Sequence, residues 1–373
     1  MRVALVHYWL VRERGGEKVL KAIHGVFPDA VIFTNVHDPR HTPSFADASI
    51  ETTFVQKLPF ARSLYQSYLP LMPSALEALD LNSFDLVISS ESGPAKGVLA
   101  RPGATHISYV HSPMRYVWNM YPDYMRRANP AVRTLFPFVA NYLRMWDVTS
   151  ATRVDQFVSN SHNVPARVRR YWGRGSDVIH PPVEIEAFET SARDDGFYLY
   201  VGELVDYKRA DVVVDAFARM RRKLIVIGGG KESEALQKRG GGCVTFLGRV
   251  GAEALKDYYA RCKAVIFAAE EDFGIVPLEA MASGKPVIAY GAGGALESVI
   301  AGKTGLFFPE QSADAVIAAV DAFEANATRF DPAVIRAHAE TFATPVFQAK
   351  FKSLVERALN PGGPRVHTVA ASR

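Results

Sequence analysis

MRVALVHYWLVRERGGEKVLKAIHGVF, residues 1–27, decides the fold of this chain. The apolar run at Val3–His7 predicts a buried strand, and the glycine-containing segment RERGGEKV after it predicts a loop. Apolar residues then recur at helical spacing, at Val19, Leu20, Ile23, Val26 and Phe27. A strand, a glycine loop and a helix in this order are typical of the start of a doubly wound parallel sheet.

More short, buried-type strands follow in the first half of the chain, separated by stretches long enough to hold helices. We place them at Ala30–Thr34, Leu86–Ser89, Thr105–Val110 and Gln156–Ser159. This alternation of strands and helices predicts an α/β domain, a parallel sheet covered on both faces.

The second half of the chain repeats the same rhythm. Its strands are expected at Phe197–Val201, Leu224–Ile227, Val244–Leu247, Ala264–Phe267 and Pro286–Ala289. Because Pro181 and Pro182 are stiff and cannot donate backbone hydrogen bonds, they suit a linker between two sheets. We therefore expect an N-terminal Rossmann-like domain over 1–185 and a second over 186–340, facing a central cleft. A helix over 341–360 is expected to return to the first domain, and residues 361–373 are expected to be disordered.

Composition narrows the function classes. At 373 residues, 48% of them apolar and 22% charged, the chain is long enough for two globular domains. Its net charge of +4 is too mild for a typical nucleic-acid binder, so no nucleic-acid partner is expected. No secretion signal and no run of 18 or more uncharged apolar residues is apparent. Cys243 and Cys262, without metal-ligand neighbours, favour a reducing, cytoplasmic location.

The most informative stretch in the second domain is EDFGIVPLE, Glu271–Glu279. If Phe273–Ile275 is a turn that opens a helix, the backbone N–H groups of that helix could bind a diphosphate, with Gly274 allowing a close approach. Glu279 could then accept hydrogen bonds from a ribose, and Glu271 from sugar hydroxyls. By spacing alone, an isolated pair of this kind is better explained as solvated acids that cap a helix near its N-terminus.

Three further features could bind phosphate. Lys208 and Arg209 follow a strand and a short turn, where two cations could stabilise the charge of a departing diphosphate. An ordinary basic pair on the protein surface would show the same sequence pattern. Gly15 and Gly16 offer backbone donors before the first helix. Gly228–Gly230 would let the chain turn close to a nucleotide. None of these glycines forms a G-x-G-x-x-G fingerprint, which disfavours a nicotinamide-dependent dehydrogenase.

Polar residues also follow the strands of the first domain. His111 ends the strand HISYV, at the edge where ligands of parallel sheets bind, although a lone histidine is often structural. Glu91 and Lys96 follow an earlier strand and are weaker candidates for contact with an acceptor.

With these motifs together, the chain resembles the retaining glycosyltransferases of family 4, which have the GT-B fold. EDFGIVPLE is similar to their E-x-F-G-(I/L)-x-x-x-E motif, VGELVDYKR to their G-R-L-x-x-x-K segment, and GGALESVIAGKTGLFF to their G-G-x-x-E…T-G-x-L-F ending. HSPMRYVW resembles a segment found in members that act on mannose-type donors, the bacterial mannosyltransferases of polysaccharide biosynthesis. The similarity covers about residues 1–360.

The resemblance implies roles for individual residues. It places Glu271 and His111 by the transferred sugar and Lys208 on phosphate, and a direct proton-transfer role for His111 stays open. It places Glu279 by the ribose, and the backbone of Phe273, Gly274, Ile275 and Val276 by the sugar and diphosphate. The chain departs from the family at Glu203, where many members have an arginine. Either Arg209 takes over part of that role or the diphosphate is held differently.

The implied reaction is hexosyl transfer, most readily of mannose from GDP-mannose, to a lipid-linked or polysaccharide precursor. The family transfers sugar by same-face attack, in which the leaving phosphate takes the acceptor's proton. Since no Asp-x-Asp motif follows a strand, we expect no metal and no other cofactor. Two alternatives stay open: a nucleotide-sugar epimerase of the same fold, and a catalytically silent sugar-nucleotide-binding subunit.

Two segments of the first domain, KLPFARSLYQSYLPLMPSALEAL and MRRANPAVRTLFPFVANYLRMW, mix basic with aromatic and aliphatic residues. Helices of this kind can lie on an anionic membrane, which suits peripheral attachment to the inner face of the cytoplasmic membrane and an acceptor on a polyprenyl diphosphate. They could equally pack on the sheet or form a dimer interface.

Overall fold

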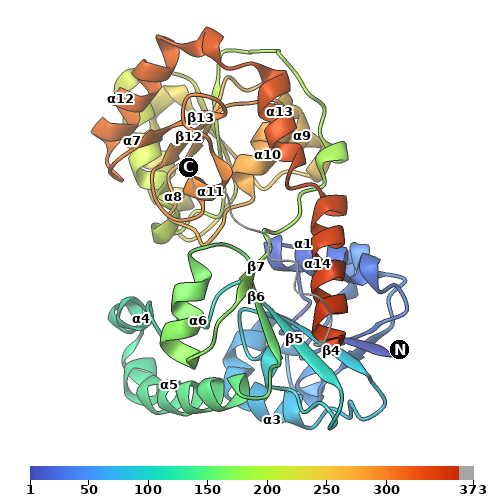
Figure 1. Cartoon of the computed structure of the whole chain (residues 1–373). Coiled ribbons are helices and arrows are strands. Elements are labelled where there is room, and N and C mark those ends of the chain that lie inside the picture. The colour runs from blue at the N-terminus through green and yellow to red at the C-terminus, as the bar shows by residue number, and fades with distance from the viewer. Residues whose placement is uncertain (361–373) are drawn as a thin grey trace. The chain divides into compact units, whose positions relative to one another are not determined.

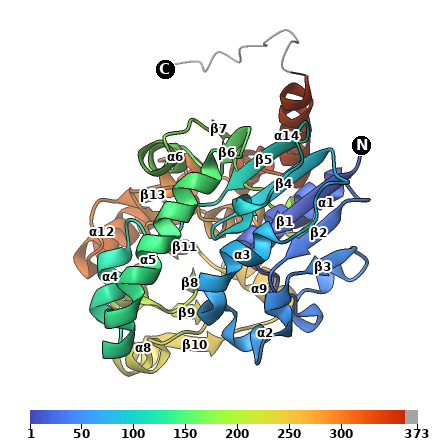
Figure 2. The ribbon, with the colours of Figure 1, turned by 90° about the horizontal axis from the view of Figure 1, so that it is seen from below.

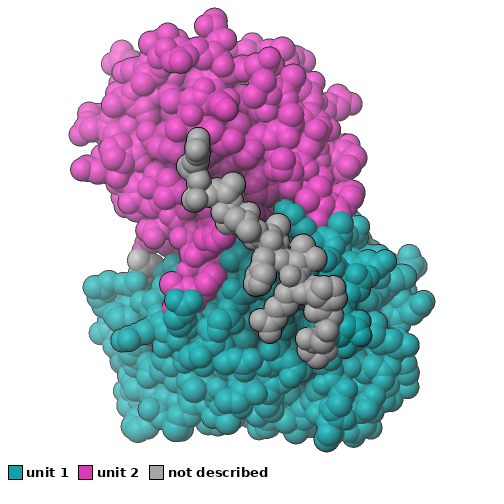
Figure 3. Space-filling model, in the orientation of Figure 1, with its two compact units in different colours: residues 1–159, 167–179, 348–373 teal, residues 160–166, 180–347 magenta. Residues whose placement is uncertain are grey.

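The computed structural model describes residues 1–360, and the chain forms two compact units (Figures 1 and 3). Unit 1 comprises residues 1–159, 167–179 and the chain from 348 onward, and unit 2 comprises residues 160–166 and 180–347. The chain enters the main part of unit 2 at His180, close to the expected linker. The tail 361–373, expected to be disordered, lies outside the described residues.

Unit 1 is built on a seven-stranded sheet in the order β3-β2-β1-β4-β5-β6-β7, and every pairing in it is parallel. Its strands are β1 Val3–His7, β2 Val31–Thr34, β3 Ile50–Thr52, β4 Leu86–Glu91, β5 Thr105–Val110, β6 Gln156–Ser159 and β7 Asp177–Val178. β1 pairs with β4 from Val3 opposite Leu86 to His7 opposite Ser90. The ends of these two central strands are thus level at the carboxyl edge of the sheet.

Helices connect these strands and cover the sheet, as Figure 2 shows for α1, α3 and α5. They are α1 Gly15–Val26, α2 Ala61–Leu64, α3 Met72–Glu77, α4 Tyr121–Arg127, α5 Pro130–Ala151 and α6 Val164–Trp172. Gly15 and Gly16, expected in the loop before the first helix, are instead the first two residues of α1. One apolar core includes Ala4, Val6 and Val87, and a second includes Met72 and Leu143.

Unit 2 repeats the plan with a six-stranded sheet in the order β10-β9-β8-β11-β12-β13, again with parallel pairings throughout. Its strands are β8 Tyr198–Val201, β9 Leu224–Ile227, β10 Val244–Gly248, β11 Val265–Phe267, β12 Val287–Tyr290 and β13 Gly305–Phe308. Its helices are α7 Ala210–Met220, α8 Ser233–Gly240, α9 Ala252–Arg261, α10 Val276–Ala282, α11 Ala295–Ser298, α12 Ala313–Glu324 and α13 Pro332–Glu340.

The last helix, α14, spans Thr344–Leu359. From Gln348 onward it belongs to unit 1, where the Gln348 amide donates a hydrogen bond to the Ala22 carbonyl of α1 and Phe351 packs edge-on against Tyr109. Among the described residues, no helix combines the length and the apolar character needed to cross a membrane.

The expected doubly wound α/β architecture is confirmed in both units, and ten strands fall where the sequence placed them within a residue or two. Three strands were missed, β3, β7 and β13. β3 reads IET and is largely exposed, and β7 is two residues long, so neither carries the apolar run that identifies a buried strand. Cys243 and Cys262 are both free thiols.

Candidate active site

Both sheets have a point at which the strand order reverses. In unit 1 the chain proceeds from β1 outward in one direction to β3 and then restarts at β4, and in unit 2 it does the same from β8 to β10 and then restarts at β11. Ligands of open α/β sheets bind beyond the carboxyl ends of the strands at such a point. The loops after β1, β4, β8 and β11 are therefore expected to contain the residues that bind ligands.

In unit 2 the reversal point holds an ion pair. Lys208 ends the short helical turn Asp206–Lys208 after β8, and Glu271 follows β11. The Lys208 ammonium contacts the Glu271 Oε1 atom, and both side chains are mostly buried, with exposed fractions of 19% and 23%. Burial opposes the charge on Lys208, but the Glu271 carboxylate, together with Tyr207 and Glu203, outweighs it and raises the pKa of the lysine. Lys208 thus offers a fixed positive charge beside a carboxylate.

Glycines shape the turn that carries Glu271. Gly274 has a φ of 84°, a left-handed conformation that other residues rarely adopt. The loop after β12 lies directly on the turn, because the Gly294 N–H donates to the Glu271 carbonyl at 2.9 Å. A Cβ on Gly294 would lie 2.2 Å from the Phe273 Cα. Two motifs that the sequence presents separately, EDFGIVPLE and GGALES, therefore form one packed structure.

Glu279 lies in α10, where it is 7% exposed. The hydroxyl of Tyr259, on α9, donates a hydrogen bond to Glu279 Oε2 at 3.0 Å, and burial together with this carboxylate raises the pKa of Tyr259 well above its usual value. The tyrosine thereby fixes the orientation of the carboxylate. Since α10 has only seven residues, the dipole of this helix adds little to the site.

Arg209 is held by other residues. Its guanidinium donates to both carboxylate oxygens of Asp211, at 3.0 and 3.2 Å, and to the backbone and side-chain oxygens of Gln311. The residue itself adopts a left-handed conformation with a φ of 53°. These bonds tie Arg209 to the start of α7, which argues against its taking over the role of the arginine that Glu203 replaces.

Glu203 lies close enough to Lys208 to raise the pKa of that lysine further. It follows Gly202, and the chain from Gly202 to Leu204 runs against the glycines after β9. A Cβ on Gly228 would lie 1.8 Å from the Gly202 carbonyl oxygen, and one on Gly230 would lie 2.2 Å from that of Leu204. These glycines serve the close approach of two loops.

Unit 1 has its own cluster at the reversal point. His7, the last residue of β1, lies with its Nε2 atom 3.5 Å from the Glu17 carboxylate on α1. The Ser90 hydroxyl of β4 is hydrogen-bonded to His111 Nε2 at 2.9 Å. A Cβ on Gly16 would lie within 3.7 Å of both histidine rings, so Gly16 lies beside both of them. The sequence picked out Gly16 and His111 and missed the other three residues.

Burial and neighbouring groups shift the pKa values of two residues in this cluster, His111 and Glu17. Burial, and secondarily the nearby His7, lowers the pKa of His111 to about 3, so its imidazole is neutral near pH 7. Burial opposes the charge of Glu17, but the hydrogen bond to His7, the charge attraction of His7 and two backbone hydrogen bonds together outweigh it and lower the pKa of this carboxylate. His7 Nδ1 is buried and has no hydrogen-bond partner among the residues that the structure describes. His111 is thus a neutral hydrogen-bonding group and a poor proton donor.

Glu91 and Lys96, the two weaker candidates for contact with an acceptor, lie in β4 and after it. Lys96 is completely buried, pairs with the carboxylate of Asp147 on α5, and lies 4.3 Å from the ring centre of Trp172. The indole N–H groups of Trp118 and Trp172 each donate to the same carboxylate at 2.8 Å. This burial argues against contact between Lys96 and an acceptor and makes it a core residue. Glu91 is the last residue of β4, and its side chain is not described.

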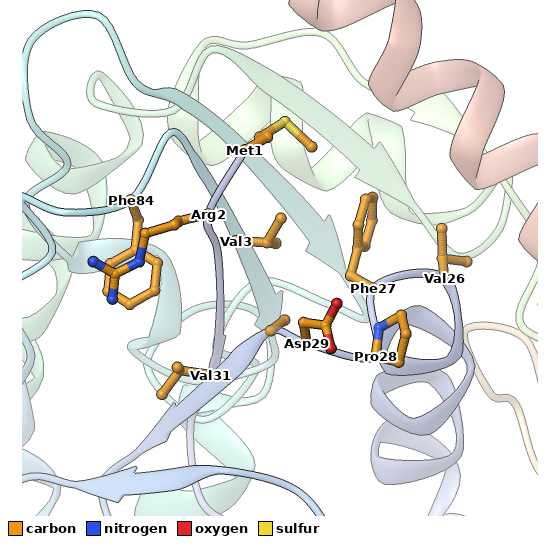
Figure 4. A pocket seen from close by; sticks show the side chains of 10 residues that line it. Met1, Arg2, Val3, Val26, Phe27, Pro28, Asp29, Val31 and Phe84 are labelled. Atoms are coloured by element: carbon orange, nitrogen blue, oxygen red, sulfur yellow. The ribbon is translucent and has the colours of Figure 1, made fainter.

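A hollow of about 330 Å³ lies elsewhere, at the amino ends of β1 and β2 (Figure 4). Arg2, Phe27, Asp29 and Phe84 are among its lining residues. Because it opens at the edge of the sheet opposite to His7 and Ser90, it is separate from the candidate active site.

Comparison with known proteins agrees with the geometry. Residues 183–337, less than half of the chain, match the family model described as "Glycosyl transferases group 1". Over 140 residues, 32% of the chain, it is 38% identical to the GDP-mannose-dependent alpha-(1-6)-phosphatidylinositol monomannoside mannosyltransferase of Mycobacterium tuberculosis, of which the match covers 36%. It is also 24% identical over 233 residues to the O-antigen chain mannosyltransferase C of Escherichia coli, covering 60% of each chain.

The chain therefore resembles bacterial mannosyltransferases, as the sequence indicated. The matches cover only about a third to three fifths of the length of these relatives. Among solved structures, HepE from Anabaena in complex with UDP matches with a TM-score of 0.72 and 17% identity, over 95% of this chain and all of that one. That likeness confirms the GT-B fold.

Proposed function

We propose that this chain is a retaining, metal-independent glycosyltransferase that moves mannose from GDP-mannose to a lipid-linked oligosaccharide or polysaccharide precursor. The observation that carries the proposal is the ion pair of Lys208 and Glu271. Its members come from the loops after β8 and β11, on either side of the reversal point where an α/β sheet binds its ligand.

Lys208 is the group suited to the leaving diphosphate. When the bond from the sugar to the diphosphate breaks, negative charge grows on the leaving oxygen, and a cation fixed nearby lowers the energy of that transition state. The raised pKa keeps Lys208 charged, and its partial burial strengthens its interaction with phosphate. When Lys208 binds the diphosphate, Glu271 loses it as a partner and accepts hydrogen bonds from the hydroxyls of the sugar instead.

In the proposed reaction the acceptor attacks the sugar on the same face from which the diphosphate leaves, so the configuration at the sugar is retained. The leaving phosphate oxygen takes the proton of the acceptor hydroxyl while the new glycosidic bond forms on the same face. A glycosidase-like route would need a carboxylate nucleophile paired with a carboxylic acid about 5–5.5 Å away. Here Glu271 has Lys208 as its nearest charged partner, which favours a role in positioning.

Glu279 is assigned to the ribose of the nucleotide. Tyr259 holds one of its oxygens, so the carboxylate has a fixed direction. A carboxylate that is already oriented pays less entropy on accepting a hydroxyl pair than one that is free to rotate. In unit 1, neutral His111, oriented by Ser90, is assigned to hydrogen bonding with the transferred sugar.

Two names among the relatives support the choice of substrates. The mycobacterial protein is named for GDP-mannose and a phosphatidylinositol mannoside, and the Escherichia coli protein for mannosyl transfer to the O-antigen chain. Carried over to this chain, they favour GDP-mannose and an acceptor on a lipid.

Helix α5 offers a surface for such an acceptor's membrane. Figure 2 shows it as a long helix of unit 1, and its apolar residues recur on one exposed face at Leu135, Phe138, Tyr142 and Met145. Phe138 is 75% exposed and Leu135 65%. Residues 121–151 include four arginines and two aspartates, and one of these aspartates, Asp147, is buried. The segment therefore carries a net positive charge. We assign this face to an anionic bilayer, which binds aromatic and basic residues together.

A donor screen tests the proposal. Thermal shifts of the purified chain with GDP-mannose, UDP-glucose and ADP-glucose should show stabilisation by GDP-mannose, by about 2.7 kcal/mol at a hundred times its Kd. Transfer to a polyprenyl-diphosphate-linked acceptor is then measured with and without EDTA, and it should not change. A strict Mg²⁺ requirement would overturn the metal-independent mechanism.

The same assay separates the two alternatives. An epimerase converts the donor when no acceptor is present, and a silent subunit binds the donor without transferring it to any acceptor. We expect neither result. The position of Glu203 near Lys208 is the feature that a silent subunit would explain best.

A further inference from the structure

A second cluster of chemistry-bearing side chains lies in unit 2, beside the turn that carries Glu271. His162 precedes α6, His180 precedes the Pro181–Pro182 segment, and Glu297 lies in α11. One ligand atom from each of the three residues lies within 4.8 Å of the other two. Glu297 lies 135 positions from His162 and 117 from His180 in the sequence, and folding brings it to the two histidines.

We propose that His162, His180 and Glu297 form a binding site for a transition-metal ion of the zinc class. Two imidazole nitrogens and one carboxylate oxygen, with water as the fourth ligand, are a common set for zinc in proteins. Imidazole and carboxylate together suit zinc and cobalt better than the hard ions Mg²⁺ and Ca²⁺, which prefer oxygen ligands throughout.

The Glu297 carboxylate is already held in place. Its oxygens accept hydrogen bonds from the His162 backbone N–H at 3.0 and 2.9 Å and from the Asn163 amide at 3.0 Å. Outer contacts of this kind fix the direction of a ligating carboxylate and raise the affinity of a metal site. Glu297 therefore needs no reorganisation to serve as a ligand.

His180 is also fixed. Its ring stacks on Phe273 at 5.2 Å between centres with an interplanar angle of 23°, and it packs on Phe342 at 5.4 Å. Its Nε2 atom lies 2.9 Å from Glu297 Oε2, where a hydrogen bond now joins the two. Ligand atoms on one tetrahedral zinc ion are about 3.4 Å apart, given bonds of about 2.0–2.1 Å. Insertion of an ion in place of the shared proton therefore needs only a small displacement.

His162 completes the set. Its side chain is exposed, and its ring lies edge-on to that of His180 at 5.8 Å between centres. An exposed ring can rotate to bring a nitrogen to the ion without disturbing the core. Its side chain is also the one member that can be removed without touching the hydrogen bonds to Glu297, since these come from its backbone.

The test uses the full chain, stripped with chelator and free of any histidine tag. Zn²⁺ is titrated by calorimetry, and Co²⁺ by the visible absorption that marks tetrahedral coordination. We expect one site, weakened at least tenfold by His162→Ala. His41→Ala is the matched control, because His41 is another exposed histidine bound to a carboxylate, that of Asp38. It should leave the site unchanged.

Three results would overturn the proposal: no Zn²⁺ binding to the unaltered chain, equal affinity in His162→Ala, or an equal loss in His41→Ala. Glu297→Gln gives a second check, with the same loss expected. Since this variant also alters contacts to Asn163 and His180, its circular dichroism and thermal transition are recorded alongside, and His162→Ala decides the result if it is unstable. The experiment measures metal binding only, so its outcome is independent of sugar transfer.

Discussion

The ammonium of Lys208 and the carboxylate of Glu271 form an ion pair in unit 2, although 63 positions separate them in the sequence. Each comes from the loop after a different central strand, and the two strands, β8 and β11, are neighbours in the sheet. Under the proposed function, the pairing holds a cation where a departing diphosphate would need one.

Replacing Lys208 by methionine should reduce transfer by about 100- to 1000-fold, because a fixed group that stabilises developing charge contributes that much. Stabilisation by the donor in a thermal-shift assay should fall as well. Lys238→Met is the control, since Lys238 also pairs with a carboxylate, Glu234, on the exposed surface of the same unit. Equal activity of the two variants would remove Lys208 from the site.

Adding a methyl group at Gly294 should displace the Glu271 turn. The new Cβ in Gly294→Ala would lie 2.2 Å from the backbone of Phe273, which cannot move as a flexible side chain can. We expect a loss of about 1–3 kcal/mol in unfolding free energy and no stabilisation by GDP-mannose.

The control for this change is Gly242→Ala, where the new Cβ would meet no described atom within 4 Å and the backbone is not left-handed. Its unfolding free energy should change by less than about 0.5 kcal/mol. Donor binding by Gly294→Ala with the affinity of the unaltered chain would show that the two loops act independently.

The exposed face of α5 can be tested with vesicles. Phe138→Ser should reduce co-sedimentation with anionic vesicles, by roughly tenfold or more, because a large apolar side chain contributes about 1.5–3 kcal/mol when it leaves water. Val334→Ser changes a comparably placed apolar residue, 49% exposed on α13 of unit 2, and should have no effect. Sedimentation that is equal with neutral and anionic vesicles, or equal in the two variants, would contradict the membrane assignment.

Stability should fall on acidification because of His106. Burial lowers its pKa to about 4, while its pKa in the unfolded chain is about 6.5. The folded state therefore binds fewer protons, and the stability that the neutral ring contributes is complete above pH 6.5 and is lost as the pH falls toward 4. The limiting slope is about 1.4 kcal/mol per pH unit for this group.

Urea unfolding at several pH values between 7 and 4 measures this slope. In His106→Gln the side chain can still hydrogen-bond to Ser89, as the histidine does at 3.0 Å, but it cannot titrate. The curve of the variant should be flatter over this range. Parallel curves would mean that His106 is protonated in the folded state.

Much of the fold could be predicted from the sequence because parallel strands buried on both faces are near-continuous apolar runs. That is why β1, β5, β6 and β9 were located to the residue, whereas the exposed β3 and the two-residue β7 were not. Glu271, Gly274 and Glu279 belong to one local motif, and its resemblance to a family motif, rather than the spacing alone, led to the prediction of a donor turn, which stays a prediction.

Only the tertiary structure decided which charged groups are available for chemistry. Lys208 and Arg209 are adjacent in sequence, yet one pairs with Glu271 and the other with Asp211 and Gln311. Lys96, expected to meet an acceptor, is buried against Asp147. A sequence specifies short-range conformation through spacing and backbone preference, but the partner of a charge is set by packing between distant segments, which no local pattern records.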